Sequence, residues 1–174
     1  MRPTKDEYYL HIAREVATRS TCLRSCYGAV LVRNDRILST GYNGSRRGGD
    51  NCVDVGECAR KDIPSRTRYE LCHAVHAEMN AIINAGCDVS GAKIYIAGFA
   101  AERFHFDGTI EEKIHHKVFP CVMCFRQMTN AGIAKVCIRD FDSKPVTTDL
   151  VAFDWLERPV INTETGETEY RPWK

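Results

Sequence analysis

The sequence of 174 residues lacks the signals of a membrane or exported protein. It contains no apolar run long enough to span a bilayer, and its first residues do not show the basic, apolar and small-residue succession of a secretory leader. It also lacks internal repeats and low-complexity tracts. These absences exclude integral membrane and fibrous classes, and we expect a cytoplasmic globular protein.

The sequence also has almost no net charge. Its 24 Lys and Arg residues balance 23 Asp and Glu residues, which leaves +1. This balance argues against an extended surface for nucleic acid, although a local basic pocket stays open. A chain of this length buries about 70% of the surface of its unfolded state, so we expect a single domain over residues 1–174.

Cysteine, in contrast, is abundant. The nine cysteines form an odd count, and disulfides rarely persist in a protein that is not exported. Metal ligands, catalytic thiols and buried packing residues are therefore the expected roles. Cys87 and Cys137 are expected to be buried thiols.

Hydrophobic periodicity and turn residues predict the order helix, hairpin, helix, strand, helix and strand. The expected elements are a helix over 4–19, a hairpin of 27–32 and 36–40, a helix over 76–86, a strand over 93–97, a helix from 120 to 132 and a strand over 135–139. Right-handed crossovers make the later strands parallel, in an α/β fold of three layers. Residues 51–71 are expected to form a loop with short helical turns, and beyond residue 139 we expect only a helical turn over 150–156 and a small hairpin around 163–167.

Two short motifs contain the ligands of a catalytic zinc site. His76 and Glu78 open one predicted helix, and Cys121 and Cys124 lie in the first turn of another. Both helices are expected to start at the carboxyl ends of neighbouring parallel strands, on one edge of the sheet, where the motifs can meet. One imidazole and two thiolates suit a catalytic zinc ion, which keeps a fourth position for water. Glu78, outside the coordination shell, is the candidate proton shuttle.

Each motif alone has a simpler explanation. Cys121 and Cys124 could form a structural zinc knuckle or a redox dithiol, and Glu78 could be a solvated carboxylate at a helix start. However, His-x-Glu followed by Pro-Cys-x-x-Cys is the signature of zinc nucleobase deaminases. The presence of both halves, in the expected order, favours the catalytic site.

Over about residues 1–139 the sequence resembles the deoxycytidylate (dCMP) deaminases of the cytidine deaminase superfamily. The motifs that carry the resemblance are Arg2-Pro3, Asp6-Glu7-Tyr8, Arg19-Ser20-Thr21-Cys22-Leu23-Arg24, Gly28-Ala29-Val30, Gly41-Tyr42-Asn43-Gly44, His76-Ala77-Glu78-Met79-Asn80-Ala81-Ile82 and Asn130-Ala131-Gly132-Ile133. The resemblance implies a cytidine deaminase-like α/β/α fold with a mixed five-stranded sheet. It also implies hydrolytic removal of the 4-amino group of dCMP, giving dUMP and ammonia and supplying the dTMP pathway.

The resemblance further implies binding residues and partners. Asn43 would contact the sugar or the base, and Arg24, Arg46 and Arg47 are candidates for the phosphate, although exposed arginines often only solvate a surface. Many such enzymes are homo-oligomers, often hexamers, activated by dCTP and inhibited by dTTP with Mg²⁺. The sequence leaves the oligomer and the effectors open.

Two segments depart from the common pattern of this family. Residues 98–119 form an insertion, expected to be a lid or an oligomer contact, where many relatives pass almost directly from strand to Pro-Cys. Residues 140–174 form a C-terminal extension. The insertion leaves the substrate open, with another cytosine nucleotide, a nucleoside or a nucleic acid as alternatives. A separate alternative is a non-catalytic regulator that binds a structural zinc ion and a nucleotide.

Four further cysteines indicate a second, structural zinc site. A closed tetrahedral site could be formed by Cys22, Cys52, Cys58 and Cys72. It would tie the loop around residues 51–71, called the polar loop below, to the end of the first helix. Cys26 and His73 are alternative ligands. Isolated packing cysteines remain the simpler explanation.

Overall fold

A mixed sheet of five strands forms the centre of the molecule. The computed structural model describes residues 2–64, 67–100, 120–139, 145–150, 157–161 and 168–172. In the order of the sheet the strands are β2 (Arg36–Tyr42), β1 (Ser25–Arg33), β5 (Lys93–Ala100), β6 (Lys135–Arg139) and β7 (Pro145–Asp149). β5 and β6 are parallel, whereas the other neighbouring pairs are antiparallel. The predicted mixed sheet is confirmed.

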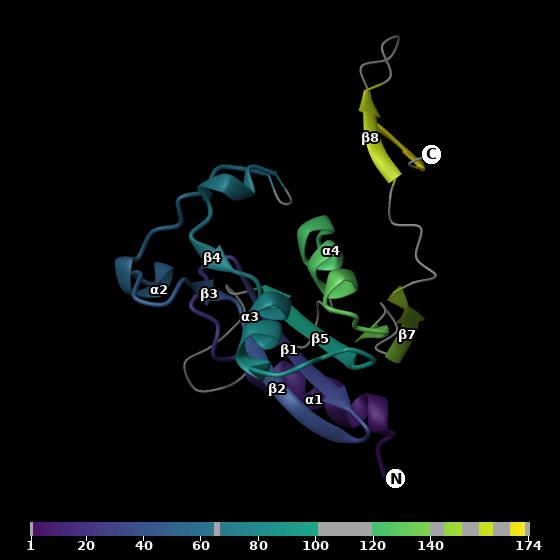
Figure 1. The fold of residues 1–174 in the computed structure, drawn as a ribbon. Coiled ribbons are helices and arrows are strands. Elements are labelled where there is room, and N and C mark those ends of the chain that lie inside the picture. Colours follow the sequence, from purple (N-terminus) through teal and green to yellow (C-terminus); the bar gives the residue numbers. More distant parts are fainter. Residues whose placement is uncertain are drawn as a thin grey trace.

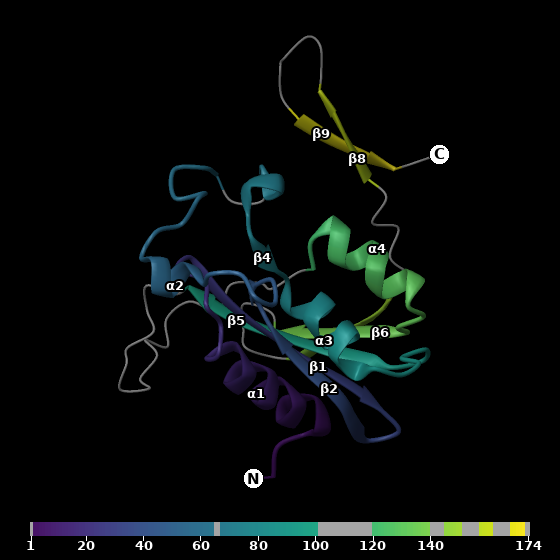
Figure 2. The ribbon, with the colours of Figure 1, turned by 60° about the vertical axis from the view of Figure 1, so that its left-hand side comes forward.

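Helices cover both faces of this sheet. α1 (Lys5–Ala17) packs on one face, and α3 (Ala77–Ala85) and α4 (Val122–Asn130) lie on the other, as Figures 1 and 2 show from two directions. The side chains of successive residues in β1 point to opposite faces of the sheet. Val30 packs in the core beneath α1, and Leu31 packs in the core beneath α3 and α4. The three-layer prediction is therefore confirmed.

Local sequence signals mark the start of α1, the turn between β1 and β2 and the end of α3. Thr4 and Glu7 form a capping box at the start of α1, with the Glu7 amide donating to Thr4 Oγ1 at 3.2 Å and the Thr4 amide donating to the Glu7 carboxylate at 2.7 Å. Asn34 and Asp35 have φ of 51° and 61°, which is the backbone that a two-residue hairpin requires. Gly86, with φ of 60°, terminates α3.

Two glycines of the hairpin allow the helices to lie directly on the strands. A Cβ at Gly28 would lie 2.1 Å from the carbonyl oxygen of Ala13 in α1. A Cβ at Gly41 would lie 2.3 Å from the amide nitrogen of Ala81 in α3. Both distances are far below a van der Waals contact, so a side chain at either position would push a helix off the sheet.

The remaining elements are short. The polar loop contains α2 (Cys52–Val55) and a 3₁₀ turn, η1 (Tyr69–Leu71), and the pair β3 (Gly44–Ser45) and β4 (Ala74–Val75) links its two ends. β8 (Glu157–Ile161) and β9 (Thr168–Pro172) pair antiparallel, which confirms the small C-terminal hairpin, and both views show it apart from the main sheet (Figures 1 and 2). None of the described helices has the length and apolar character needed to cross a bilayer.

The structure adds a strand that carried no sequence signal and leaves two expectations outside the described residues. β7 borders β6 in the antiparallel direction, so the parallel arrangement is limited to β5 and β6. The first three residues of the expected insertion, 98–100, continue β5. The rest of it, 101–119, and the helical turn over 151–156 lie outside the described residues.

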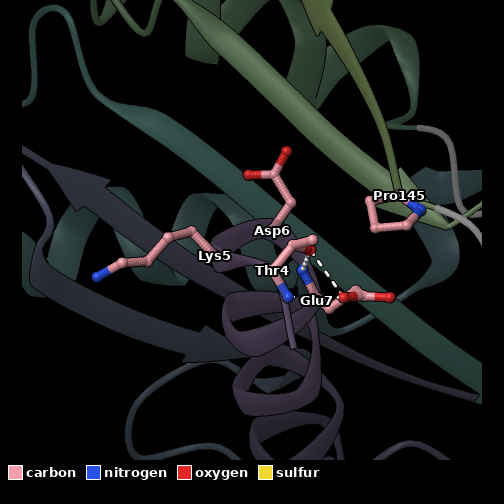
Figure 3. Close-up of a pocket in the computed structure, with 5 residues that line it drawn as sticks. All are labelled: Thr4, Lys5, Asp6, Glu7 and Pro145. Atoms are coloured by element: carbon pink, nitrogen blue, oxygen red, sulfur yellow. Dashed lines mark hydrogen bonds between the residues drawn. The ribbon is translucent and has the colours of Figure 1, made fainter. Parts of the chain in front are cut away.

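A carboxylate at the start of α1 joins this helix to two strands. Asp6 Oδ1 accepts hydrogen bonds from Lys93 Nζ at 2.7 Å and from the Tyr95 hydroxyl at 2.8 Å, and Oδ2 accepts one from Thr147 Oγ1 at 3.1 Å. Asp6 also lines a pocket of about 460 Å³ beside the capping box and Pro145 (Figure 3). Burial raises the pKa of Asp6, but the hydrogen bonds from Lys93 and Tyr95 outweigh it, so the pKa lies below its ordinary value.

We expect Asp6→Asn to lower the free energy of unfolding by about 1 kcal/mol at pH 7. A carboxyl whose pKa is lower in the folded state stabilises the fold above its ordinary pKa of about 3.9, and this contribution is lost as the pH falls through the folded value. The difference between wild type and variant should therefore shrink below about pH 4. Urea unfolding at pH 7 and pH 3 measures it, with the exposed Asp62→Asn as control. An equal difference at both pH values would contradict the ionic role.

Candidate metal centre and active site

The starts of α3 and α4 bring the two sequence motifs together. His76 is the N-cap residue of α3, and Cys121 is the N-cap residue of α4, three residues before Cys124. In the main sheet the last strand before α3 is β2, although β3, the polar loop and β4 lie between them, and the last strand before α4 is β5. β2 and β5 point the same way because each is antiparallel to β1 between them. The expected edge is therefore right, but the two strands are separated by β1 and are not neighbours.

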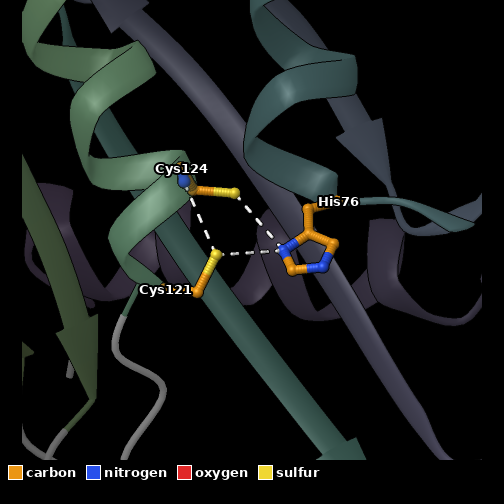
Figure 4. A group of neighbouring side chains, drawn as sticks. All are labelled: His76, Cys121 and Cys124. Atoms are coloured by element: carbon orange, nitrogen blue, oxygen red, sulfur yellow. Dashed lines mark hydrogen bonds between the residues drawn. The ribbon is translucent and has the colours of Figure 1, made fainter. Parts of the chain in front are cut away.

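The three side chains converge on one point (Figure 4). His76 Nδ1 lies 3.4 Å from Cys121 Sγ and 3.3 Å from Cys124 Sγ. All three donor atoms lie within 4.8 Å of one another, and they form the one group of three or more such donors in the described part of the chain. Cys124 is buried, and the other two side chains are half-buried.

This donor set fits a zinc ion. Zinc binds thiolate sulfur at about 2.3 Å and imidazole nitrogen at about 2.0 Å, and a tetrahedral angle between such bonds places the two donors about 3.5 Å apart. The observed sulfur to nitrogen distances of 3.3 and 3.4 Å are close to that value. Three ligands leave a fourth tetrahedral position, as catalytic zinc sites require. His76, Cys121 and Cys124 could therefore hold the ion.

The local electrostatics keep one thiol ionised. Hydrogen bonds from Cys124 and His76 lower the pKa of Cys121 to about 4, against the opposing effect of burial. The hydrogen bond that Cys124 donates to Cys121, together with burial, raises the pKa of Cys124. The hydrogen bond with Cys121 also raises the pKa of His76. Protons and a metal ion compete for these donors, which makes the affinity for the metal dependent on pH.

Glu78 lies beside this group without belonging to it. Its side chain is 7% exposed, in the first turn of α3. Burial raises the pKa of this carboxyl, while its backbone hydrogen bond and the charge of His76 lower it less. A buried carboxyl near the donors, with a raised pKa, has the properties of a general acid and base.

Asn43 is buried but already has partners. Its Oδ1 accepts a hydrogen bond from the Tyr27 amide at 2.7 Å, and its Nδ2 donates to the Ser25 carbonyl at 2.8 Å. The amide thus supports the backbone of β1. One N–H and one lone pair remain for a ligand.

The three candidate arginines differ in burial and in partners. Arg24 is half-buried, and its Nη1 donates to the backbone carbonyl of Arg60 at 2.8 Å. Arg46 and Arg47 are exposed after β3. Arg24 therefore has a structural partner, whereas Arg46 and Arg47 are open to solvent.

The four cysteines of the expected second site lie in one region. Burial, followed by the neighbouring thiols of Cys22, Cys58 and Cys72, raises the pKa of Cys52. All four are half-buried and free. They do not form a group with three donors within 4.8 Å, so the second metal site stays a prediction.

The other cysteines and the alternative ligands are distributed as follows. Cys26 is buried on β1, and His73 is exposed. Cys137 is buried, as expected, but Cys87 is exposed and the prediction of a buried thiol there is wrong. Cys87 directly follows the glycine that ends α3, where the chain has left the core.

Two side chains near His76 had no sequence signal. Arg60 is buried within the polar loop, and Tyr69 places its ring 5.4 Å from the ring of His76. Neither residue belongs to a recognisable motif, and the loop shows no periodicity that would have predicted their burial.

The three-layer fold, with a His-Cys-Cys group at two helix starts, defines a protein of the cytidine deaminase fold. A family model described as the cytidine and deoxycytidylate deaminase zinc-binding region matches residues 3–139. The chain belongs to this family. The match covers both halves of the candidate site.

Known relatives agree with this assignment. The chain is 34% identical to the deoxycytidylate deaminase of Schizosaccharomyces pombe over 78% of this chain and 37% of the relative. It is 32% identical to the ComE operon protein 2 of Bacillus subtilis over 83% of this chain and 65% of the relative. A crystal structure of dCMP deaminase from the cyanophage S-TIM5, in complex with dCMP and dUMP, superposes with a TM-score of 0.55 and 26% identity, over 80% of this chain and 83% of that chain. The chain thus spans well under half of the fungal relative.

We expect His76→Ala and Cys124→Ala each to remove one zinc ion per chain. Lowering the pH should release the same ion, because protons compete for the thiols and the imidazole. Elemental analysis of the dialysed protein measures the loss. The exposed Cys87→Ala serves as the control and should lose none. Equal zinc content in all variants would rule out this site.

Proposed function

We propose that the chain catalyses the zinc-dependent hydrolytic deamination of dCMP to dUMP and ammonia. The observation that carries the proposal is the convergence of His76, Cys121 and Cys124 beside the buried Glu78. Family membership and the relatives' names support it, as does the related phage enzyme crystallised with dCMP and dUMP.

Glu78 provides the proton transfers. When bound, zinc supplies a Lewis acid that makes a water molecule nucleophilic at neutral pH. The Glu78 carboxylate would accept one proton from the attacking water and pass it to the ring nitrogen. It would then accept the proton of the hydroxyl that the attack adds to the ring carbon and deliver it to the amino group, which leaves as ammonia while the carbonyl forms. Its burial raises its pKa, which suits a carboxyl that both accepts and donates a proton. A purely structural zinc site has no use for this carboxyl.

The nucleotide would extend from the metal towards the loops around Asn43. The remaining hydrogen-bonding capacity of Asn43 suits a sugar hydroxyl, and Arg46 and Arg47 are open for a phosphate. Arg24 is the weaker phosphate candidate because it already donates to the Arg60 carbonyl.

We also propose a pathway, a location and an assembly for this activity. The dUMP product would feed dTMP synthesis in the cytoplasm. The chain would act as a single domain in a homo-oligomer, with dCTP and Mg²⁺-bound dTTP as effectors. Sedimentation of the purified protein with and without each nucleotide tests the assembly.

We also propose a structural zinc ion at Cys22, Cys52, Cys58 and Cys72. The loop that contains three of them buries few apolar side chains, so metal–thiolate bonds would supply the free energy that orders it. Backbone amides donate to two of the sulfurs, from Arg24 to Cys22 and from Arg60 to Cys58, each at 3.4 Å.

A second zinc ion should therefore disappear in Cys52→Ser. Elemental analysis should show two zinc ions per chain in the wild type and one in this variant, whereas Cys87→Ser should retain both. One zinc ion in all three proteins would exclude the four-cysteine site and leave the catalytic site untouched.

Glu78→Ala should lower kcat by about 10⁴-fold, because general acid–base catalysis at one residue contributes up to about this factor and Glu78 serves both transfers. Zinc content and the unfolding curve should stay those of the wild type. Ammonia release measures turnover, with the exposed Glu15→Gln on α1 as control. Substantial remaining activity would contradict the role of Glu78.

A substrate panel tests the proposed specificity. The purified wild type is given dCMP, dCTP, deoxycytidine, cytidine and short single-stranded DNA at equal concentrations, and ammonia release is followed. We expect the highest kcat/KM for dCMP. Turnover of another cytosine compound with dCMP inert would retain the chemistry and reject the substrate. No turnover of any substrate, with zinc bound, would favour the regulatory alternative.

A further inference from the structure

Arg60 is a buried cation without an ion-pair partner among the described residues. It is 8% exposed, and the described part of the chain contains two other buried polar side chains, Asn43 and Glu78. A guanidinium is costly to bury unless hydrogen bonds replace its water. Its position therefore calls for an explanation.

The guanidinium of Arg60 hydrogen-bonds to the backbone of the polar loop and lies over the ring of an aromatic side chain. Arg60 Nη2 donates to the carbonyl oxygens of Thr67 and, at 3.5 Å, Pro64, and the guanidinium carbon lies 4.8 Å from the ring centre of Tyr69. Arg60 Nε is buried without a hydrogen-bond partner among the described residues. The arginine is thus held by two carbonyls and one ring, and Arg24 holds its backbone.

The residue before Tyr69 has an unusual backbone conformation, which turns the chain so that the Tyr69 ring lies next to Arg60. Arg68 has φ of 51°, in the left-handed region that residues with a side chain rarely adopt. Such a conformation persists where the surroundings determine it. The bend starts the 3₁₀ turn η1, which begins with Tyr69.

Tyr69 in turn contacts the candidate metal ligand. Its ring meets the ring of His76 edge to face, with 5.4 Å between centres and an angle of 67°. A histidine that binds a metal usually donates its second N–H to a carboxylate, a carbonyl or water, and that bond fixes the plane of the ring. The edge contact of Tyr69 restrains the same ring plane from a different side chain.

We propose that Arg60 and Tyr69 are positioning residues for His76. Arg60 clamps the ring of Tyr69, and the edge contact holds the imidazole plane so that Nδ1 faces the sulfurs of Cys121 and Cys124. The polar loop thereby becomes part of the metal centre. This inference rests on the proposed function, since it assigns His76 as a ligand.

The test follows Co²⁺ in place of Zn²⁺, because the visible absorption of Co²⁺ reports its ligand geometry. The variants are Arg60→Met, Arg60→Lys, Tyr69→Leu and Tyr69→Phe, and the controls are the exposed Arg36→Met and Tyr8→Leu. Each spectrum is corrected by that of the same variant combined with Cys124→Ala. This correction removes any cobalt bound by the other cysteines.

Arg60→Met and Tyr69→Leu should weaken Co²⁺ binding by about 10-fold to 100-fold and change the band intensities, as loss of an orienting partner does at metal sites. Tyr69→Phe retains the ring and should match the wild type, as should both controls. Arg60→Lys should behave as Arg60→Met, because an ammonium group cannot reach both carbonyls and stack on the ring. Wild-type cobalt affinity and spectra in Tyr69→Leu would overturn the proposal, and so would rescue by lysine.

Kinetics separate positioning from substrate contact. With dCMP, kcat of Arg60→Met and Tyr69→Leu should fall about 10-fold or more while KM stays within about twofold. A rise in KM alone, with an unchanged cobalt spectrum, would make Tyr69 a substrate contact and overturn the proposal. Thermal unfolding of the metal-free proteins identifies a variant that fails to fold, and the Tyr69→Leu and Tyr69→Phe pair then decides. A wild type that binds no cobalt at this site would reject the proposed function itself.

Discussion

An imidazole and two thiols, packed within 4.8 Å of one another at two helix starts, impose the strictest requirement in this protein. Donor atoms of this kind compete for protons at short range, as the lowered pKa of Cys121 and the raised pKa of His76 show. Such a group is stable only where the backbone holds it or where a metal replaces the protons. Much of the fold can be understood as the scaffold that brings α3 and α4 to this point.

The sheet meets this requirement through close contact between helices and strands. Because Gly41 has no side chain, the backbone of α3 lies directly on β2, and the start of α3 is then set by the strand beneath it. Asn80 and Asn84 of α3 strengthen this contact, since their side-chain amides donate to the carbonyls of Tyr42 and Thr40 at 2.8 and 3.0 Å. His76 therefore has a position that is determined by backbone contacts, which move less than side chains.

The polar loop between β3 and β4 follows a different principle. It buries little apolar surface, and the directional contacts within it are the hydrogen bonds from Arg60 to two carbonyls and the one from Arg24 to the Arg60 carbonyl. Tyr69 transmits that order to His76. The loop and the metal centre are therefore coupled through a short chain of side chains, although nothing in the local sequence of the loop indicates it.

The sequence by itself determined the helix and strand order, the capping box of α1, the turn at Asn34 and Asp35 and the donor set of the metal centre, because these depend on neighbours a few residues apart. Only the tertiary structure decided the antiparallel direction of β7, the exposure of Cys87, the engagement of Asn43 with β1 and the contact of Arg60 and Tyr69 with His76. Glu78 belongs to both: its motif predicted a proton carrier, whereas its burial in the fold raises its pKa. The physical reason is that burial and pairing depend on segments distant in sequence, whereas periodicity, capping and donor chemistry are local.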